Sequence, residues 1–167
     1  MVTRDCDGQH DAGLMERLAK GDTSALACLY ERYGAMVGSL IYRLAPELPR
    51  ATIEDLTQDV FITVLDQAAK YREEGKLKSW LCGIAARKVR NHRRTWFVRR
   101  NLLTQHTEEK QQESAVRRDR LSTGETRMEI NWALDKLSHQ HREIIMLHEV
   151  EGLSGEEIAA ALHIAPK

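Results

Sequence analysis

Three arginines in this sequence have a spacing suited to binding a polyanion. Arg87, Arg90 and Arg94 stand at positions i, i+3 and i+7, which places them on one side of a helix. Guanidinium groups in such a row can contact successive phosphates of a nucleic acid and release its counterions. The amide of Asn91, on the same side, can donate and accept hydrogen bonds at a base edge. The pattern predicts a nucleic-acid-binding helix.

The alternative for this stretch is a solvated basic face, which is what most runs of charge are. Two observations favour nucleic-acid binding. Residues 80–107 contain no Asp or Glu, and tryptophan and phenylalanine stand among the Arg and Lys residues. Trp80 opens the helix, and we expect its ring to anchor the core. Four residues lie in or near the preceding loop: Tyr71, Arg72, Lys76 and Lys78. They could contact an unpaired base or form a plain surface loop.

An acidic stripe precedes the basic stretch. Residues 51–69 contain no Lys or Arg, and one side of a helix there would carry Asp55, Gln58, Asp59, Ile62 and Asp66. The carboxylates repel one another, so an isolated helix gains nothing from the stripe, whereas a basic partner would relieve the repulsion. Docking on a protein, a simple solubility face and a helix-capping role for Asp55 behind Thr52 remain open on this evidence.

No set of residues indicates catalysis. The sequence has no glycine-rich phosphate loop, no Ser-His-Asp order and no pair of catalytic carboxylates that can be argued. His141 and His148 would share a helix side, but no third ligand is placed, which makes a zinc site a weak prediction. We therefore predict no catalytic residues, no metal and no cofactor, and a protein that is not an enzyme.

The composition bounds the fold class. Net charge is zero, 30% of the residues are charged, 42% are apolar and only three are proline, which is typical of an all-helical protein. No apolar run approaches membrane-spanning length, and the N-terminus lacks the apolar segment of a signal peptide. Cys6, Cys28 and Cys82 are widely separated, which favours reduced thiols in a cytoplasmic protein.

Apolar periodicity and helix breakers locate the elements. Helices are predicted over 11–20, 52–69, 79–94 or 79–99, 127–137, 138–152 and 154–162. A further helix, the second along the chain, capped by Asp22 or Ser24, is predicted to carry the apolar residues from Leu26 to Leu44. Trp96 is expected on the apolar side of the fourth helix, and Ser138 and Ser154 are expected to cap the last two. The segment 101–125 has no apolar period and is expected to be a solvated linker. The prediction is all-α: a domain over 1–97, a flexible linker over 98–126 and a second small domain over 127–167.

Together these segments resemble the extracytoplasmic-function sigma factors of bacterial RNA polymerase. Residues 55–61 are similar to the family's helix that docks on core polymerase, in region two. Residues 80–85 and 91–94 are similar to its promoter-melting and minus-ten segments, and residues 134–137, 140–143 and 151–159 to the start of region four. The order and the separations match over nearly the whole chain after residue 11.

The resemblance implies roles for individual residues. The stripe of Asp55, Gln58, Asp59, Ile62 and Asp66 would bind the polymerase. The minus-ten DNA would be bound by Lys76, Lys78, Trp80, Arg87, Lys88, Arg90, Asn91 and Arg94. The implied partners are core RNA polymerase, promoter DNA and an anti-sigma factor, with no membrane insertion.

The sequence also departs from the family pattern. Leu77 stands where the family often has Phe, Asn91 where it often has Asp, and Gly83 replaces a common basic or bulky residue. The chain stops at Lys167, where the family continues with a recognition helix for the minus-thirty-five element. A partial region four is therefore expected, poorly folded and without stable minus-thirty-five recognition.

These observations predict a sigma factor that directs promoter-specific initiation. The alternative is an interaction module that docks on polymerase or on an anti-sigma factor without productive promoter binding. A helix-turn-helix repressor is a third possibility, against which the acidic stripe argues.

Overall fold

The fold of the described residues is entirely helical, as the composition predicts. The computed structural model describes residues 10–71, 76–104, 133, 134 and 136–164, without the side chains of 99–104. Its α-helices are α1 (Asp11–Ala19), α2 (Ser24–Leu44), α3 (Arg50–Gln67), α4 (Leu77–Thr104), α6 (His139–Ile145) and α7 (Gly155–Leu162). A 3₁₀ turn, η1 (Ala68–Lys70), follows α3, and a π-helical turn, η2 (Met146–Val150), follows α6.

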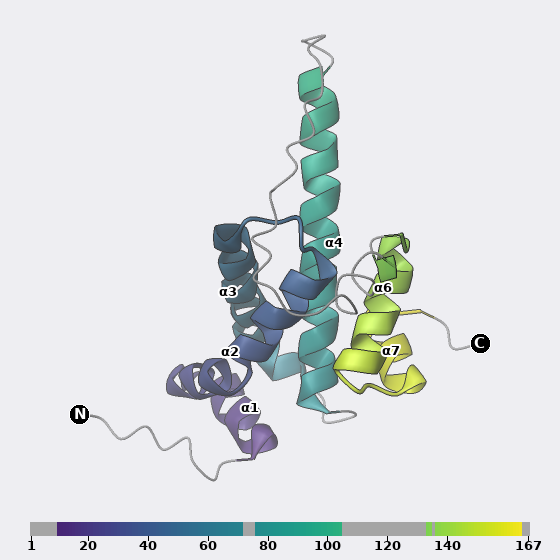
Figure 1. The fold of residues 1–167 in the computed structure, drawn as a ribbon. Helices are drawn as coiled ribbons and strands as arrows, with labels where there is room; N and C mark the ends of the chain where they lie inside the picture. Colours follow the sequence, from purple (N-terminus) through teal and green to yellow (C-terminus); the bar gives the residue numbers. More distant parts are fainter. Residues whose placement is uncertain (1–9, 72–75, 105–132, 135, 165–167) are drawn as a thin grey trace, which may run out of the picture.

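Helix α4 is the central element of the molecule. In Figure 1 it stands between α1, α2 and α3 on one side and α6 and α7 on the other, and its far end projects beyond them all. It packs against α2, α3 and α7. Its buried side chains, among them Leu81, Ile84 and Val89, belong to one hydrophobic cluster that also contains Leu147 and Leu162 from the C-terminal helices. The two predicted domains thus meet across α4.

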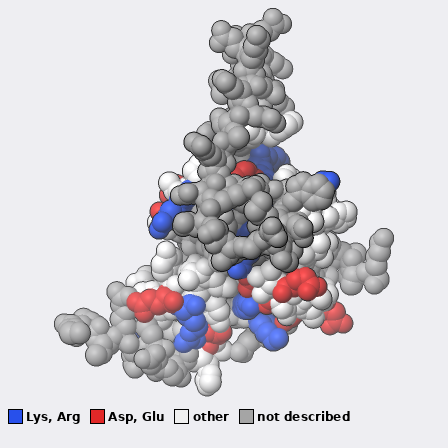
Figure 2. Space-filling model, in the orientation of Figure 1, with Lys and Arg blue, Asp and Glu red and all other residues white. Residues whose placement is uncertain are grey.

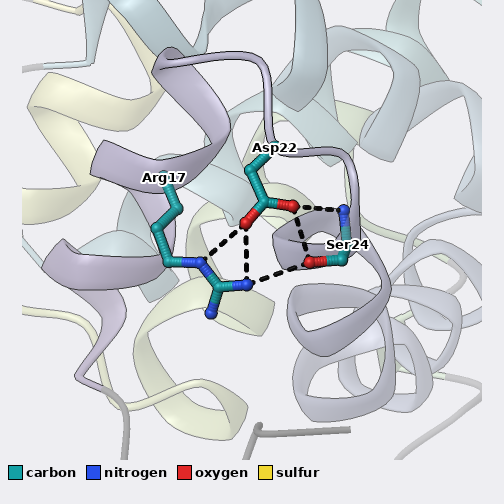
Figure 3. A network of polar contacts seen from close by, with 3 residues as sticks. All are labelled: Arg17, Asp22 and Ser24. Carbon is teal, nitrogen blue, oxygen red and sulfur yellow. Dashed lines mark hydrogen bonds and ion pairs between the residues drawn. The ribbon is translucent and has the colours of Figure 1, made fainter. Parts of the chain in front are cut away.

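The turn between α1 and α2 is stabilised by a local polar network (Figure 3). The Asp22 carboxylate accepts hydrogen bonds from the backbone N–H and the hydroxyl of Ser24, and from Arg17 Nε at 2.9 Å. These hydrogen bonds, those from Ser24 first, lower the pKa of Asp22. Gly21 adopts a φ of +91°, which a residue with a side chain adopts only with strain. The network sets the direction in which α2 leaves the turn.

Helix α3 begins earlier than the sequence predicts. Its N-cap is Pro49, whose φ of −59° already suits a helix, and Arg50 is the first helical residue. Thr52 lies inside the first turn, so the suggested cap by Thr52 and Asp55 is wrong. Asp55 is instead exposed.

Helix α4 is longer than predicted at both ends. It begins at Leu77 and runs to Thr104, into the segment expected to be linker. The prediction for Trp96 is wrong, because its side chain is 55% exposed and does not continue the apolar side formed by Leu81 and Val89. Apolar periodicity ends at Val89, but Arg favours helix almost as strongly as Leu does, which allows the helix to continue beyond its packed part.

Both predicted serine caps in the C-terminal part are present. The Ser138 hydroxyl accepts a hydrogen bond from the backbone N–H of His141 at the start of α6. Ser154 and Glu157 form a reciprocal capping box at the start of α7. Helix α7 ends at His163, which takes the left-handed conformation with φ 54°.

The prediction of three reduced thiols is wrong. Cys28 is disulfide-bonded, whereas Cys82 is a free and fully buried thiol. Cys6 lies outside the described residues. Burial, followed by the negative charge of Glu151, raises the pKa of Cys82 to about 12, which keeps this thiol protonated. Within the part of the chain that the structure describes, no helix has the length and apolar character needed to cross a membrane.

Candidate nucleic-acid interface and protein-docking surface

The acidic stripe lies on the outer side of α3. Leu56, Val60 and Val64 are buried on the inner side of this helix. All five predicted docking residues are exposed on the other side: Asp55, Gln58, Asp59, Ile62 and Asp66. Ile62 is 54% exposed, an apolar side chain amid carboxylates.

Two neighbours add to this surface. Leu65, 37% exposed, extends the apolar part around Ile62. It was not predicted, because it lies one position outside the periodic stripe. Arg50, the basic residue that begins α3, is paired with Glu54 at 2.8 Å rather than with an aspartate of the stripe. The stripe can therefore present both charge and an apolar contact to a partner.

The basic side of α4 is also where periodicity places it. Arg87, Arg90, Asn91 and Arg94 are exposed, and Lys88 is half-buried. Arg93, which the prediction left out of the DNA-binding set, turns inward instead. It donates hydrogen bonds to the Leu44 carbonyl at 2.9 Å and to Glu47 Oε1 at 2.7 Å, so it holds α4 against the end of α2.

Helix α4 begins closer to Lys76 than predicted, so it includes residues that were expected in the preceding loop. Leu77 is the first residue of α4, so Lys78 and Trp80 lie on the helix and only Lys76 lies just before it. The half-buried Trp80 ring lies against the Tyr71 ring, with centroids 5.0 Å apart, and anchors the start of α4 as predicted. Arg72, suggested as a base contact, lies outside the described residues.

Acidic side chains of the C-terminal helices lie against this basic face. The ion pairs are Lys76 Nζ to Glu157 Oε1 at 3.5 Å, Lys78 Nζ to Glu151 Oε2 at 3.2 Å, and Arg90 Nε to Glu143 Oε1 at 3.6 Å. Lys78 also donates a hydrogen bond to the Glu151 carbonyl at 2.6 Å, and the Arg87 guanidinium contacts the His163 ring. In the lower half of Figure 2, acidic and basic side chains adjoin one another rather than forming separate fields.

Two of these glutamates are buried. The side chains of Glu143 and Glu151 are 2% and 5% exposed. Glu151 has a second cation nearby, Arg43 on α2, at 3.7 Å. Glu143 Oε1 accepts no hydrogen bond from any described residue, and its burial raises the pKa of Glu143 against the opposing effect of Arg90 and Arg93. Neither role was predictable from the sequence, because Glu143 lies in an apolar periodic helix, Glu151 directly follows one, and nothing marks them as partners of α4.

Gly83 is the point of closest approach between α4 and α7. A Cβ atom at this position would lie 2.6 Å from the carbonyl oxygen of Ala161. Real Cβ atoms do not come so near a backbone oxygen, so the absence of a side chain at Gly83 allows the two helices to touch. The C-terminal segment is joined to α2 as well, where Arg142 Nε donates to the Arg43 carbonyl at 3.0 Å.

The site residues therefore form two separate surfaces, on α3 and on α4. Among the residues that the structure describes, no three His, Cys, Asp or Glu side chains come together as metal ligands. His148 pairs with the adjacent Glu149 at 2.8 Å. The chemistry available is that of binding: a carboxylate-rich surface on one helix and a cation-rich surface on the next.

Comparison with known protein families assigns both halves of the chain. A family model described as Sigma-70 region 2 matches residues 29–96. A second, described as Sigma-70, region 4, matches residues 127–167. The first contains both α3 and the basic part of α4.

Three relatives named as RNA polymerase sigma factors match most of the chain. RNA polymerase sigma factor CarQ of Myxococcus xanthus is 30% identical over 152 residues, which cover 91% of this chain and 84% of the relative. RNA polymerase sigma factor YlaC of Bacillus subtilis is 30% identical over 140 residues, covering 80% and 77%. The ECF RNA polymerase sigma-E factor of Escherichia coli is 28% identical over 169 residues, covering 91% and 82%.

A solved structure shares the fold. It is described as CnrH in complex with the cytosolic domain of CnrY, and it aligns with a TM-score of 0.62 at 21% identity. The alignment covers 93% of this chain and 84% of that one, so the likeness includes the C-terminal helices as well as α1 to α4.

Proposed function

The chain belongs to the extracytoplasmic-function group of the sigma-70 family and is an RNA polymerase sigma factor for promoter-specific initiation, and from this premise we propose how its charged helices divide the work. Helix α3 docks on core polymerase, and α4 holds the promoter at the minus-ten element. The proposal rests on one observation: exposed acidic side chains lie on α3, and exposed basic side chains lie on α4.

The acidic stripe of α3 is the polymerase-binding surface. Its aspartates repel one another in the free protein, and a basic surface on the polymerase would remove that repulsion. Ile62, exposed at the middle of the stripe, would be desolvated at the centre of the contact, where apolar side chains contribute most to binding. Leu65 extends this apolar contact.

The basic face of α4 is the DNA-binding surface. Arg87, Arg90 and Arg94 would neutralise phosphates of the minus-ten region, with Lys88 beside them, while Asn91 faces a base. Lys76, Lys78 and Trp80 at the start of α4 would hold a strand whose bases have left the duplex. Trapping unpaired bases supplies free energy for opening the promoter.

The remaining features follow from the family. The protein is not itself an enzyme; it works in the cytoplasm, where the polymerase carries out the chemistry. An anti-sigma factor would be a further partner, competing for the same surfaces. We propose a region-two domain over 1–97 and a region-four segment over 127–167. The linker proposed over 98–126 is helical at its start, because α4 runs to Thr104.

One observation favours the alternative function, a docking module without productive promoter binding. Several of the basic side chains that would contact DNA already form ion pairs with glutamates of the C-terminal segment. They are Lys76, Lys78 and Arg90. Such a protein would bind polymerase through α3 yet fail to open a promoter.

The test is polymerase binding and run-off transcription with a charge-reversed α3. The variant Asp55→Lys/Asp59→Lys should lower affinity for core polymerase at least tenfold, equivalent to about 1.4 kcal/mol. The matched control is Glu149→Lys/Glu156→Lys, which changes net charge equally at exposed positions outside α3. Binding is measured by biolayer interferometry.

Transcription uses templates with a randomised upstream region, both as duplex and with a pre-opened bubble. Transcripts that depend on the upstream sequence support the sigma role of α4, even if only the bubble template is used. Tight polymerase binding without such transcripts would favour the docking module, and equal binding by both double variants would refute the assignment of α3.

A further inference from the structure

The contact between α4 and the C-terminal helices combines charge pairing with close backbone packing. The charge pairs involve three glutamates, Glu143, Glu151 and Glu157, which we call the acidic cover. The close packing is at Gly83, against the backbone of Ala161. These are independent features of one interface, since the first depends on side-chain charge and the second on the absence of a side chain.

We propose that the acidic cover competes with DNA for the basic face of α4 within the same molecule, and that Gly83 is the residue that permits this closed state. The inference rests on the DNA-binding role proposed for α4. The chain would be closed when free and would have to open before Lys78 reaches a phosphate and before Arg90 is released from Glu143.

The carboxylates occupy the cations as phosphates would. Lys78 Nζ lies 3.2 Å from Glu151 Oε2 and donates a hydrogen bond to the Glu151 carbonyl, so Glu151 engages the ammonium group through both its side chain and its backbone. Glu151 is nearly buried, so its charge has exchanged water for Lys78 and for Arg43. A phosphate cannot engage Lys78 fully while Glu151 holds it.

The closed state depends on backbone contact that no rotamer change can relieve. The atom that a Cβ at Gly83 would meet is a carbonyl oxygen of α7, not the end of a flexible side chain. A single methyl group would therefore push α7 away from α4. The same movement would lengthen the ion pairs of Lys78 and Arg90, whose partners belong to the same segment.

The interface also has features of a contact that can open. Two of its ion pairs are long, at 3.5 and 3.6 Å, and Glu143 Oε1 accepts no hydrogen bond within the described residues. Asn91 and Arg94 remain exposed further along the same helix. DNA could bind these two first and then displace the acidic cover from Arg90.

The test compares Gly83→Ala with Gly13→Ala. Both glycines lie in helices, α4 and α1, so both substitutions raise helix propensity alike. A Cβ at Gly13 meets nothing within 4 Å, which makes this variant the matched control. Small-angle scattering measures the radius of gyration of the full chain, and fluorescence anisotropy measures its affinity for a dye-labelled single-stranded DNA of random sequence.

A second pair of variants opens the contact by charge. Glu151→Lys places a cation beside Lys78, whereas Glu149→Lys adds the same charge two residues away at an exposed position. If circular dichroism shows that Gly83→Ala has lost helical structure, the comparison of Glu151→Lys with Glu149→Lys tests the closed state instead. It also separates opening from the general effect of a more positive protein on DNA binding.

Gly83→Ala and Glu151→Lys are expected to enlarge the radius of gyration and to tighten DNA binding relative to their controls. If the closed state accounts for about nine molecules in ten, removing it tightens binding about tenfold. An unchanged radius, or a larger radius with unchanged affinity, would overturn the inference. If the enlarged variants bind no DNA at all, the proposed role of α4 fails and the inference fails with it, and the larger radius identifies that case.

Discussion

Glu143 shows at the level of one residue how the interface responds to pH. Its carboxyl group is buried, lies 3.6 Å from Arg90 and has a pKa raised mainly by burial. Protonation of this group therefore favours the folded protein over the unfolded one. Its contribution to stability is complete below the unfolded pKa of about 4.5 and is lost as pH rises through the raised value.

Glu143→Gln is expected to remove this pH dependence. The amide keeps the shape of the side chain and carries no charge, so the variant should gain in free energy of unfolding relative to wild type as pH rises from 4.5, and the gain should level off above the raised pKa. Urea denaturation at a series of pH values measures it. His139, whose pKa is lowered by burial, titrates alike in both proteins and cancels in the difference. A difference that does not change with pH would contradict the assignment.

At the level of the element, α7 depends on its first turn. It is a short helix of eight residues, and its capping box satisfies two backbone donors through Ser154 and Glu157. Ser154→Ala should lower the free energy of unfolding by about 1 kcal/mol. Ser154→Thr, which keeps the hydroxyl, should cost less. Equal losses in the two variants, measured by urea denaturation, would show that the cap does not stabilise this helix.

The elements also show how far the sequence alone could go. Serine caps and buried faces were predictable, because each depends on residues within one turn or one period, as at Ser138, Ser154 and Val60. Thr52 failed as a cap because Pro49 offered an earlier start. The prediction for Trp96 was wrong because α4 is buried only as far as its neighbouring helices extend. The periodicity of α4 itself does not indicate where those neighbours end.

The candidate surfaces follow the same rule. The exposure of the acidic stripe on α3 and of Arg87, Arg90 and Arg94 on α4 could be predicted from spacing alone. The partners of the basic face could not, since Arg90 and Glu143 are more than fifty positions apart and joined only by tertiary packing. The closest approach at Gly83 was equally hidden, because a helical glycine gives no sign of what lies opposite it.

At the level of the whole molecule, one hydrophobic cluster connects both halves. Leu147, Leu153 and Leu162 of the C-terminal segment are buried together with the core of α1 to α4. The protein should therefore unfold in a single transition, with equal calorimetric and van't Hoff enthalpies. Differential scanning calorimetry measures both. Two resolved transitions would mean that the C-terminal helices melt separately from the rest.

Because α4 is long, a small change at the Gly83 contact can displace the distant end of the helix. A helix of 28 residues extends for ~42 Å, and the 21 positions from Gly83 to Thr104 make up ~32 Å of it. The part of the helix beyond Arg93 therefore moves with any change in the direction of α4 at Gly83. A tilt of ~5° there would shift the far end by ~3 Å, given this rise per residue. Repacking by the size of one methyl group at Gly83 would therefore change the position of Thr104, the last residue of α4.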